Sequence, residues 1–221
     1  MSRISDERRS RNNQRLQALR NAVEERYGLR GLLEIRWLND ALARTEDYYT
    51  HGPRGPATWV LTLGKNFPEG AFNASSAPGR DVEPVYVARG FLQSGIQVGI
   101  ASARTALGAV LGWNWDEFPI NLYETLVVAP DAVKWVPGSN ALNLASLGAR
   151  PVEGGYEANA EPLYVAQAYL GDAWLPGKHG SHLPAAHIPH GGIENLINHY
   201  RILCYADDDL VEPQRRRGEG Y

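Results

Sequence analysis

The chain is poor in cysteine, in net charge and in long apolar runs. Its 221 residues include one cysteine, Cys204, which excludes an internal disulfide framework and a zinc site made of cysteines. A net charge of −3 offers no broad basic field, so we expect no nucleic-acid partner. No run reaches the ~20 apolar residues of a membrane span. The charged start, residues 1–9, does not look like a signal peptide, so we expect a cytoplasmic protein.

Turn-forming and aromatic residues are frequent instead. The chain has 23 glycines, 14 prolines, 11 tyrosines and 6 tryptophans, a composition that favours many short strands joined by turns. Strand-like segments do not alternate with helical ones after residue 58, so a parallel doubly wound sheet is not expected. The segments that favour strands are 59–63, 85–88, 123–128, 163–168 and 200–205.

The N-terminal part has a helical pattern. Residues 5–46 favour helix, and Gly28 and Gly31 are expected to divide it into two. The apolar residues that share one face of the first helix are Leu16, Leu19, Val23 and Tyr27. We predict an α-helical arm that either packs on the main body or serves oligomerisation. Residues 49–58, which are rich in glycine and proline, should link the arm to the strands.

The strand-rich part contains an internal repeat. Residues 83–88 read EPVYVA and return 78 positions later, at residues 161–166, as EPLYVA. Gly99 returns at the same offset as Gly177. A repeat of this length indicates a duplicated structural unit. The division that we predict is an arm at 1–50, a degenerate first repeat at 58–128, a well-preserved second repeat at 134–205 and a C-terminal tail at 206–221. Residues 212–221 of the tail are expected to be disordered.

The second repeat carries a series of short motifs with a characteristic order. They are WVPGSN at 135–140, GA at 148–149, EPLYVA at 161–166, PGK at 176–178, IPHGG at 188–192 and YRIL at 200–203. This series resembles the DM-nine repeat family over residues 134–205, and residues 58–128 resemble it weakly. The resemblance implies an all-β fold of two tandem antiparallel β units with pseudo-twofold symmetry. It also implies lectin-like binding of carbohydrate, with mannose-type ligands the best-known case.

The resemblance also implies a pair of sugar-binding residues. The acid ahead of the second Tyr-Val strand falls on Glu157, and the lysine of the PGK motif is Lys178. The first repeat has Ile100 at the position of the lysine and Gly79 at the position of the acid, although Asp81 could substitute for that acid. We therefore expect at most one competent site.

The chemistry of such a pair fits a sugar. A carboxylate accepts hydrogen bonds from adjacent hydroxyls, and an ammonium donates to the same hydroxyls or to the ring oxygen. An aromatic ring can cover the apolar face of the sugar. The predicted sugar-binding set is Glu157, Lys178, Trp174, His182 and Glu194. The alternative is that Glu157 and Lys178 form a surface ion pair between two strands and that Trp174 belongs to the core.

Two further groups of residues are open to a chemical reading. The histidines that gather near the C-terminus are His179, His182, His187, His190 and His199, yet their spacing gives weak support for a metal site. Ser181, His187 and Asp207 have the residue types of a catalytic Ser-His-Asp triad. No nucleophile-elbow motif accompanies them, so the sequence gives little support for a hydrolase. Trp113 and Trp115 are expected on one strand face, either filling the interface between the repeats or stacking on a sugar.

These observations favour a protein that is not an enzyme and needs no cofactor or metal. We predict that it binds carbohydrate through the second repeat. A single shallow site binds weakly, so a homo-oligomer with several sites is expected. The alternative is a structural or assembly protein that kept the fold and lost sugar binding.

Overall fold

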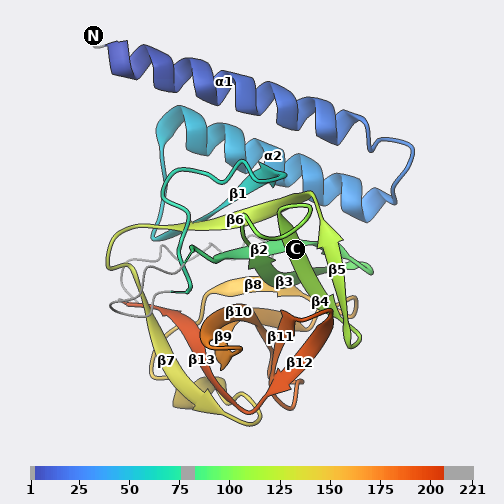
Figure 1. The fold of residues 1–221 in the computed structure, drawn as a ribbon, viewed down its shortest axis with the longest axis vertical. Helices are drawn as coiled ribbons and strands as arrows, with labels where there is room; N and C mark the ends of the chain where they lie inside the picture. Colours follow the sequence, from blue (N-terminus) through green and yellow to red (C-terminus); the bar gives the residue numbers. More distant parts are fainter. Residues whose placement is uncertain (1–2, 76–82, 207–221) are drawn as a thin grey trace, which may run out of the picture.

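The computed structural model describes residues 3–75 and 83–206. The predicted tail lies almost wholly outside these ranges, as do Gly79, Asp81 and Asp207. Two helices, α1 (Arg3–Glu24) and α2 (Leu32–His51), precede the strands, and a short 3-10 helix spans Leu144–Ser146 (Figure 1). The strands are β1 (Ala57–Leu63), β2 (Tyr86–Leu92), β3 (Gly95–Ala101), β4 (Ala109–Trp113), β5 (Asp116–Ile120), β6 (Leu122–Val128), β7 (Val133–Ser139), β8 (Glu153–Tyr156), β9 (Pro162–Leu170), β10 (Ala173–His179), β11 (Ala186–His190), β12 (Ile193–Ile197) and β13 (His199–Tyr205).

Within the described ranges, these thirteen strands form one antiparallel sheet. Their order is β1-β6-β2-β3-β4-β5-β12-β11-β10-β9-β13-β7, and β8 joins β3 to β9. The order in the second half mirrors that in the first. The halves meet where Asp116 of β5 pairs with Ile193 of β12. These two residues lie 77 positions apart, close to the offset of the sequence repeat. The prediction of an all-β fold with pseudo-twofold symmetry and a helical arm is confirmed.

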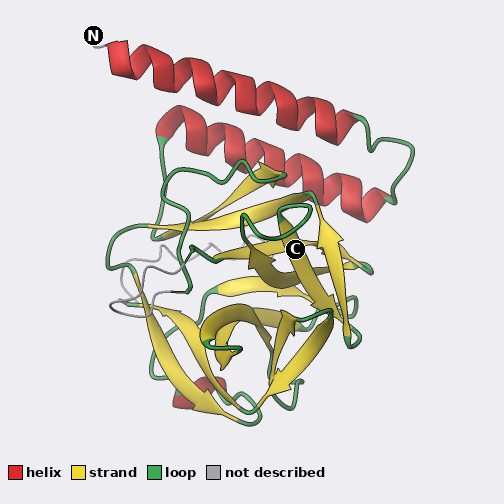
Figure 2. Cartoon of the chain, viewed as in Figure 1, coloured by secondary structure: helices red, strands yellow, loops and turns green. Residues whose placement is uncertain are grey.

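The helical arm packs on one end of the β body. Figure 2 shows both helices as a layer beside the strands, and Figure 1 places α2 between α1 and strands β1 and β6. Leu16, Leu19 and Val23 of α1 are buried, and the last two share a core with Trp37 and Leu38 of α2. The predicted apolar face is therefore used within the chain. Its fourth member is an exception, because α1 ends at Glu24 and Tyr27 is exposed.

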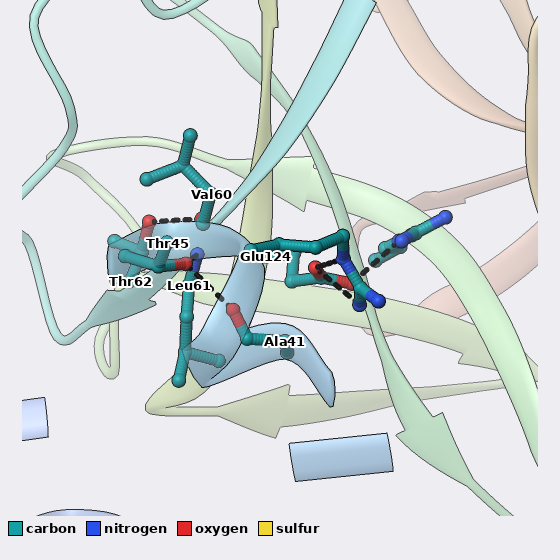
Figure 3. A network of polar contacts seen from close by, with 8 residues as sticks. Ala41, Thr45, Val60, Leu61, Thr62 and Glu124 are labelled. Carbon is teal, nitrogen blue, oxygen red and sulfur yellow. Dashed lines mark hydrogen bonds and ion pairs between the residues drawn. The ribbon is translucent and has the colours of Figure 1, made fainter. Parts of the chain in front are cut away.

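Two buried polar residues fix α2 to the sheet (Figure 3). The Thr45 hydroxyl donates to the Ala41 carbonyl oxygen at 2.8 Å and accepts from the backbone N–H of Leu61 in β1 at 2.7 Å. The Glu124 carboxylate of β6 is fully buried and pairs with Arg44 of α2 at 2.8 Å and Arg89 of β2 at 2.7 Å. These contacts set the arm against the first repeat.

Burial and pairing have opposite effects on the Glu124 carboxyl. Burial alone would raise its pKa, but Arg89 and Arg44 outweigh burial and hold the pKa below its ordinary value. Glu124 is thus ionised at neutral pH, and the anchor between α2 and the sheet is an ion pair.

The linker between the arm and the strands is shorter than the predicted residues 49–58, because α2 continues to His51 and β1 begins at Ala57.

The two repeats share their interior. One buried cluster joins Val87, Val98 and Leu126 of the first repeat to Val165 and Leu203 of the second. Both halves therefore bury apolar surface against each other, and side chains from both can meet in one site. No helix in the described part of the chain is long and apolar enough to cross a membrane.

Candidate functional site

Lys178 lies in β10 with its side chain inside the protein. Only 2% of the residue is exposed. Its Nζ donates to Gln97 Oε1 at 2.5 Å and to the Gly112 carbonyl oxygen at 2.9 Å, and it forms an ion pair with Glu194 Oε1 at 3.0 Å. The partners belong to β3, β4 and β12, so one ammonium connects strands of both repeats. Two hydrogen bonds and the ion pair with Glu194 surround the ammonium, so its charge is compensated inside the protein.

Glu194 is the buried acid of this cluster. Its Oε2 lies 3.2 Å from His187 Nδ1 and accepts a hydrogen bond from the backbone N–H of Trp115 at 3.4 Å. Burial would raise the pKa of this carboxyl, but His187 and Lys178 outweigh burial and keep the pKa below its ordinary value. The carboxylate is therefore ionised at neutral pH, as a partner for Lys178 must be.

The Glu194 carboxylate packs closely against Gly112 of β4. A Cβ on Gly112 would lie 2.7 Å from Glu194 Oε1, which is closer than real Cβ contacts come. Only glycine lets the carboxylate approach the β4 backbone here, and the same residue offers its carbonyl oxygen to Lys178. No motif in the sequence marks Gly112 as part of a site.

Glu157 lies at the outer end of the same network. It follows β8 directly and is half-buried. Its Oε2 accepts a hydrogen bond from Gln97 Nε2 at 2.8 Å, while the amide oxygen of Gln97 accepts from Lys178. Gln97 thus lies between the predicted acid and the predicted lysine, and it connects them without a direct ion pair. We call this set, Glu157, Gln97, Lys178, Glu194 and His187, the second-repeat network, because four of its members belong to the second repeat and only Gln97 comes from β3 of the first.

Trp174 and His182 make their contacts elsewhere. The Trp174 ring lies 3.8 Å from the Arg201 guanidinium and meets Tyr169 edge-on, with the ring centroids 5.7 Å apart. His182 is exposed, and its Nδ1 lies 3.9 Å from Glu161 Oε2. Among the five predicted site residues, the structure brings Glu157, Lys178 and Glu194 into one network. Within the described ranges, the contacts of Trp174 and His182 do not join it.

The other histidines have structural surroundings. His179 is fully buried, its ring lies edge-on to Tyr200 with the centroids 4.5 Å apart, and burial lowers its pKa. His187 rather than His182 or His190 is the imidazole beside Lys178 and Glu194. The described residues contain no group of three or more histidine, cysteine, aspartate or glutamate side chains that could hold a metal ion. Asp207, the acid of the hypothetical Ser-His-Asp triad, is not among the described residues.

The paired tryptophans do not share a strand face. Trp113 ends β4, whereas Asn114 and Trp115 form the turn to β5 with φ of 50° and 73°. Trp113 packs edge-on against Phe118, and Trp115 is 63% exposed. The expectation of two rings on one face is wrong, because a two-residue turn with left-handed backbone replaces the continuous strand.

The first repeat holds a counterpart of the second-repeat network. Glu117 lies 77 residues before Glu194, and each carboxylate accepts a backbone hydrogen bond from the turn of the other repeat. The Gly192 N–H donates to Glu117 Oε2 at 2.9 Å, as the Trp115 N–H donates to Glu194 Oε2. At the position of Lys178, however, the first repeat has Ile100. A hollow of about 430 Å³ lies beside Ile100 and Glu117.

Comparisons with known proteins agree with this architecture. A family model described as the DM9 repeat matches residues 79–197, more than half of the chain. The crystal structure of the nematode sperm cell motility protein MFP2B is similar, with a TM-score of 0.51, 17% sequence identity and coverage of 73% of this chain and 48% of that one. The likeness to MFP2B is one of fold, and the chain spans about half of its length. No curated protein matches the sequence.

Proposed function

Because the chain belongs to the DM9 repeat family, we propose that it binds carbohydrate through its second repeat. The fold and the family fit a lectin-like binding protein rather than an enzyme. The single observation that carries the proposal is that Glu157 and Lys178, chosen from the sequence, meet in one network through Gln97. A mannose-type sugar is the ligand that we propose.

The two residues divide the work in this proposal. Glu157 is the half-buried member, so its carboxylate is the group that accepts hydrogen bonds from adjacent sugar hydroxyls. Lys178 is buried and satisfied, so it acts as a positioning residue that holds Gln97, which in turn orients Glu157. Charge-assisted hydrogen bonds to a carboxylate contribute roughly 1.5–3 kcal/mol each.

An aromatic side chain is available beside the acid. Tyr156, the residue before Glu157, is 42% exposed at the end of β8. A tyrosine ring can cover the apolar C–H face of a pyranose and keep its hydroxyl in water. We assign Tyr156 this role in place of Trp174, whose ring is covered by Arg201.

Glu157→Gln tests the proposal most cleanly. The amide oxygen of the new side chain can still accept from Gln97, so the fold is retained while the charge is lost. We expect the wild-type protein to bind a mannose array and the variant to lose most of that binding, as measured by surface plasmon resonance. The matched control is Glu153→Gln, four residues earlier, which removes an exposed carboxylate outside the network and should leave binding unchanged.

A second candidate function has its own support. The Lys178 ammonium already has three protein partners, which suits a structural role as well as a positioning role. A structural or assembly protein that kept the fold would show no sugar response in the wild-type protein, and Glu157→Gln would then change nothing. The array experiment therefore separates the two candidates.

Oligomerisation remains part of the proposal. Several weak sites on one assembly would raise avidity without any new contact. The Leu16, Leu19 and Val23 face is buried within the chain, so an assembly would use another surface. Sedimentation velocity gives the state directly, and a monomer at working concentration would overturn this part.

We also propose a cytoplasmic location for the protein. Fluorescence microscopy of the tagged protein in cells tests this part.

A further inference from the structure

Both apolar and polar residues line the hollow beside Ile100. Its volume, about 430 Å³, lies in the range of sites that hold small molecules. The apolar residues that line it include Val85, Ile100, Val110, Leu170 and Leu175. The polar residues that line it include Glu83, Ser102, Arg104, Glu117 and His190. Residues of both repeats therefore form the walls.

The charges around the hollow leave one carboxylate without a cation. Arg104 pairs with Glu83, so these two charges neutralise each other. Glu117 accepts a backbone hydrogen bond from Gly192 at 2.9 Å, and no cation of the described residues forms an ion pair with it. A carboxylate has acceptor capacity beyond one hydrogen bond. Glu117 can therefore accept a further hydrogen bond from a positively charged donor that enters the hollow.

The second repeat indicates what kind of group would fit. There the equivalent acid, Glu194, pairs with the Lys178 ammonium, whose alkyl stem runs through the protein. Ile100 has an uncharged hydrocarbon side chain and supplies no cation to Glu117. A molecule that combines an ammonium group with an apolar body would reproduce the missing lysine side chain from outside.

We propose that the hollow binds a small organic cation, a protonated primary amine attached to an alkyl or aryl group. The ammonium donates to Glu117, and the apolar body lies against Ile100, Val110 and Leu175. This site is distinct from the second-repeat network and does not rest on sugar binding there.

The first experiment uses the unmodified protein with methyl-labelled isoleucine, leucine and valine. Phenethylamine and 2-phenylethanol, which have the same aromatic body, are titrated separately at neutral pH and followed by NMR. We expect shifts at Ile100, Val110 and Leu175, and about tenfold tighter binding of the amine, since a charge-assisted hydrogen bond is stronger than a neutral one. Equal affinities, shifts confined to other methyl groups, or no binding of the amine would overturn the proposal.

Two variants and one control sharpen the result. Glu117→Gln keeps an acceptor for the Gly192 N–H, and it should remove the preference for the amine. Ile100→Lys should supply the internal cation and fill the hollow, so that both probes lose binding. Asp116→Asn removes a neighbouring exposed carboxylate outside the hollow and should preserve the preference. If Glu117→Gln and Asp116→Asn have the same effect on the preference for the amine, Glu117 is not the recognition group. If a variant fails to fold, the comparison of the two probes on the wild-type protein still decides whether the hollow binds the amine.

Discussion

Lys178 in the second repeat and Ile100 in the first occupy equivalent positions on β10 and β3, but their surroundings differ in kind. Lys178 has Gln97, Glu194 and a backbone carbonyl oxygen around its ammonium. Ile100 has Leu175 and other apolar side chains beside an open hollow. The backbone frame is the same, since both repeats present a glutamate that accepts a hydrogen bond from the opposite turn.

The difference shows that a buried charge requires a complete set of partners. An ammonium placed in an apolar interior is costly unless opposite charge and hydrogen bonds surround it. Around Lys178 the partners are present together, because Gln97 of the first repeat faces it. The equivalent of Gln97 in the second repeat is Leu175, which lines the hollow beside Ile100. The residues around Lys178 and those around Ile100 thus differ together rather than at a single position. Single substitutions test how far the stability contributed by each residue depends on its neighbours.

The largest expected effect comes from removing the buried cation. Lys178→Met keeps the length of the side chain but leaves Glu194 buried without its ammonium partner. We expect a loss of about 3–5 kcal/mol in the free energy of unfolding, because breaking a buried ion pair on one side leaves an uncompensated charge. The matched change Ile100→Met should lose less than about 1.5 kcal/mol. Urea unfolding measures both, and similar small losses would contradict the account.

A smaller loss is expected at the residue that links acid to lysine. Gln97→Leu gives the first repeat the residue that the second repeat has at the equivalent position, Leu175. It removes one acceptor from Lys178 and the donor to Glu157, so we expect a loss of about 1–3 kcal/mol. Leu175→Met, a conservative change at the symmetric position, is the control. A Gln97→Leu protein as stable as the wild type would show that the hydrogen bonds of Gln97 contribute nothing measurable.

The smallest effect concerns acid pH. The folded pKa of Glu194 lies below its ordinary value of 4.5, so its contribution to stability is fully present above that value and is lost as the pH falls through the folded pKa. Each unit of lowering corresponds to about 1.4 kcal/mol. We expect the stability of Glu194→Gln to fall less steeply than that of the wild type below pH 4.5. Glu124, whose pKa is also lowered, contributes to the remaining slope; identical slopes would contradict the role of Glu194.

Much of the fold follows from local sequence patterns. The five predicted strand segments correspond to β1, β2, β6, β9 and β13, because each is a short run of β-branched and aromatic residues between turns. Strands such as β7 and β10 were not predicted, since Pro137 and Pro176 interrupt them and proline usually argues against a strand. Pairing with neighbours overrides that local preference.

The site was predictable only in part. Motif order led to Glu157, Lys178 and Glu194, but no motif includes Gln97, which is separated from Lys178 by 81 residues and reaches it only because the repeats pack together. The burial of Lys178 was also missed, because lysine is almost never fully buried unless it is paired. A polar residue inside the apolar run 95–101 is the one signal that could have drawn attention to Gln97.

One titration series on a single labelled sample compares the two halves directly. A mannose-type glycoside and phenethylamine are added separately to the wild-type protein, and amide, side-chain and methyl signals are followed by NMR. We predict that the sugar shifts the signals of Gln97 and Glu157 and that the amine shifts those of Ile100 and Val110. If both probes shift the same signals, or if neither shifts the group assigned to it, the account of two chemically distinct sites on one duplicated frame is contradicted.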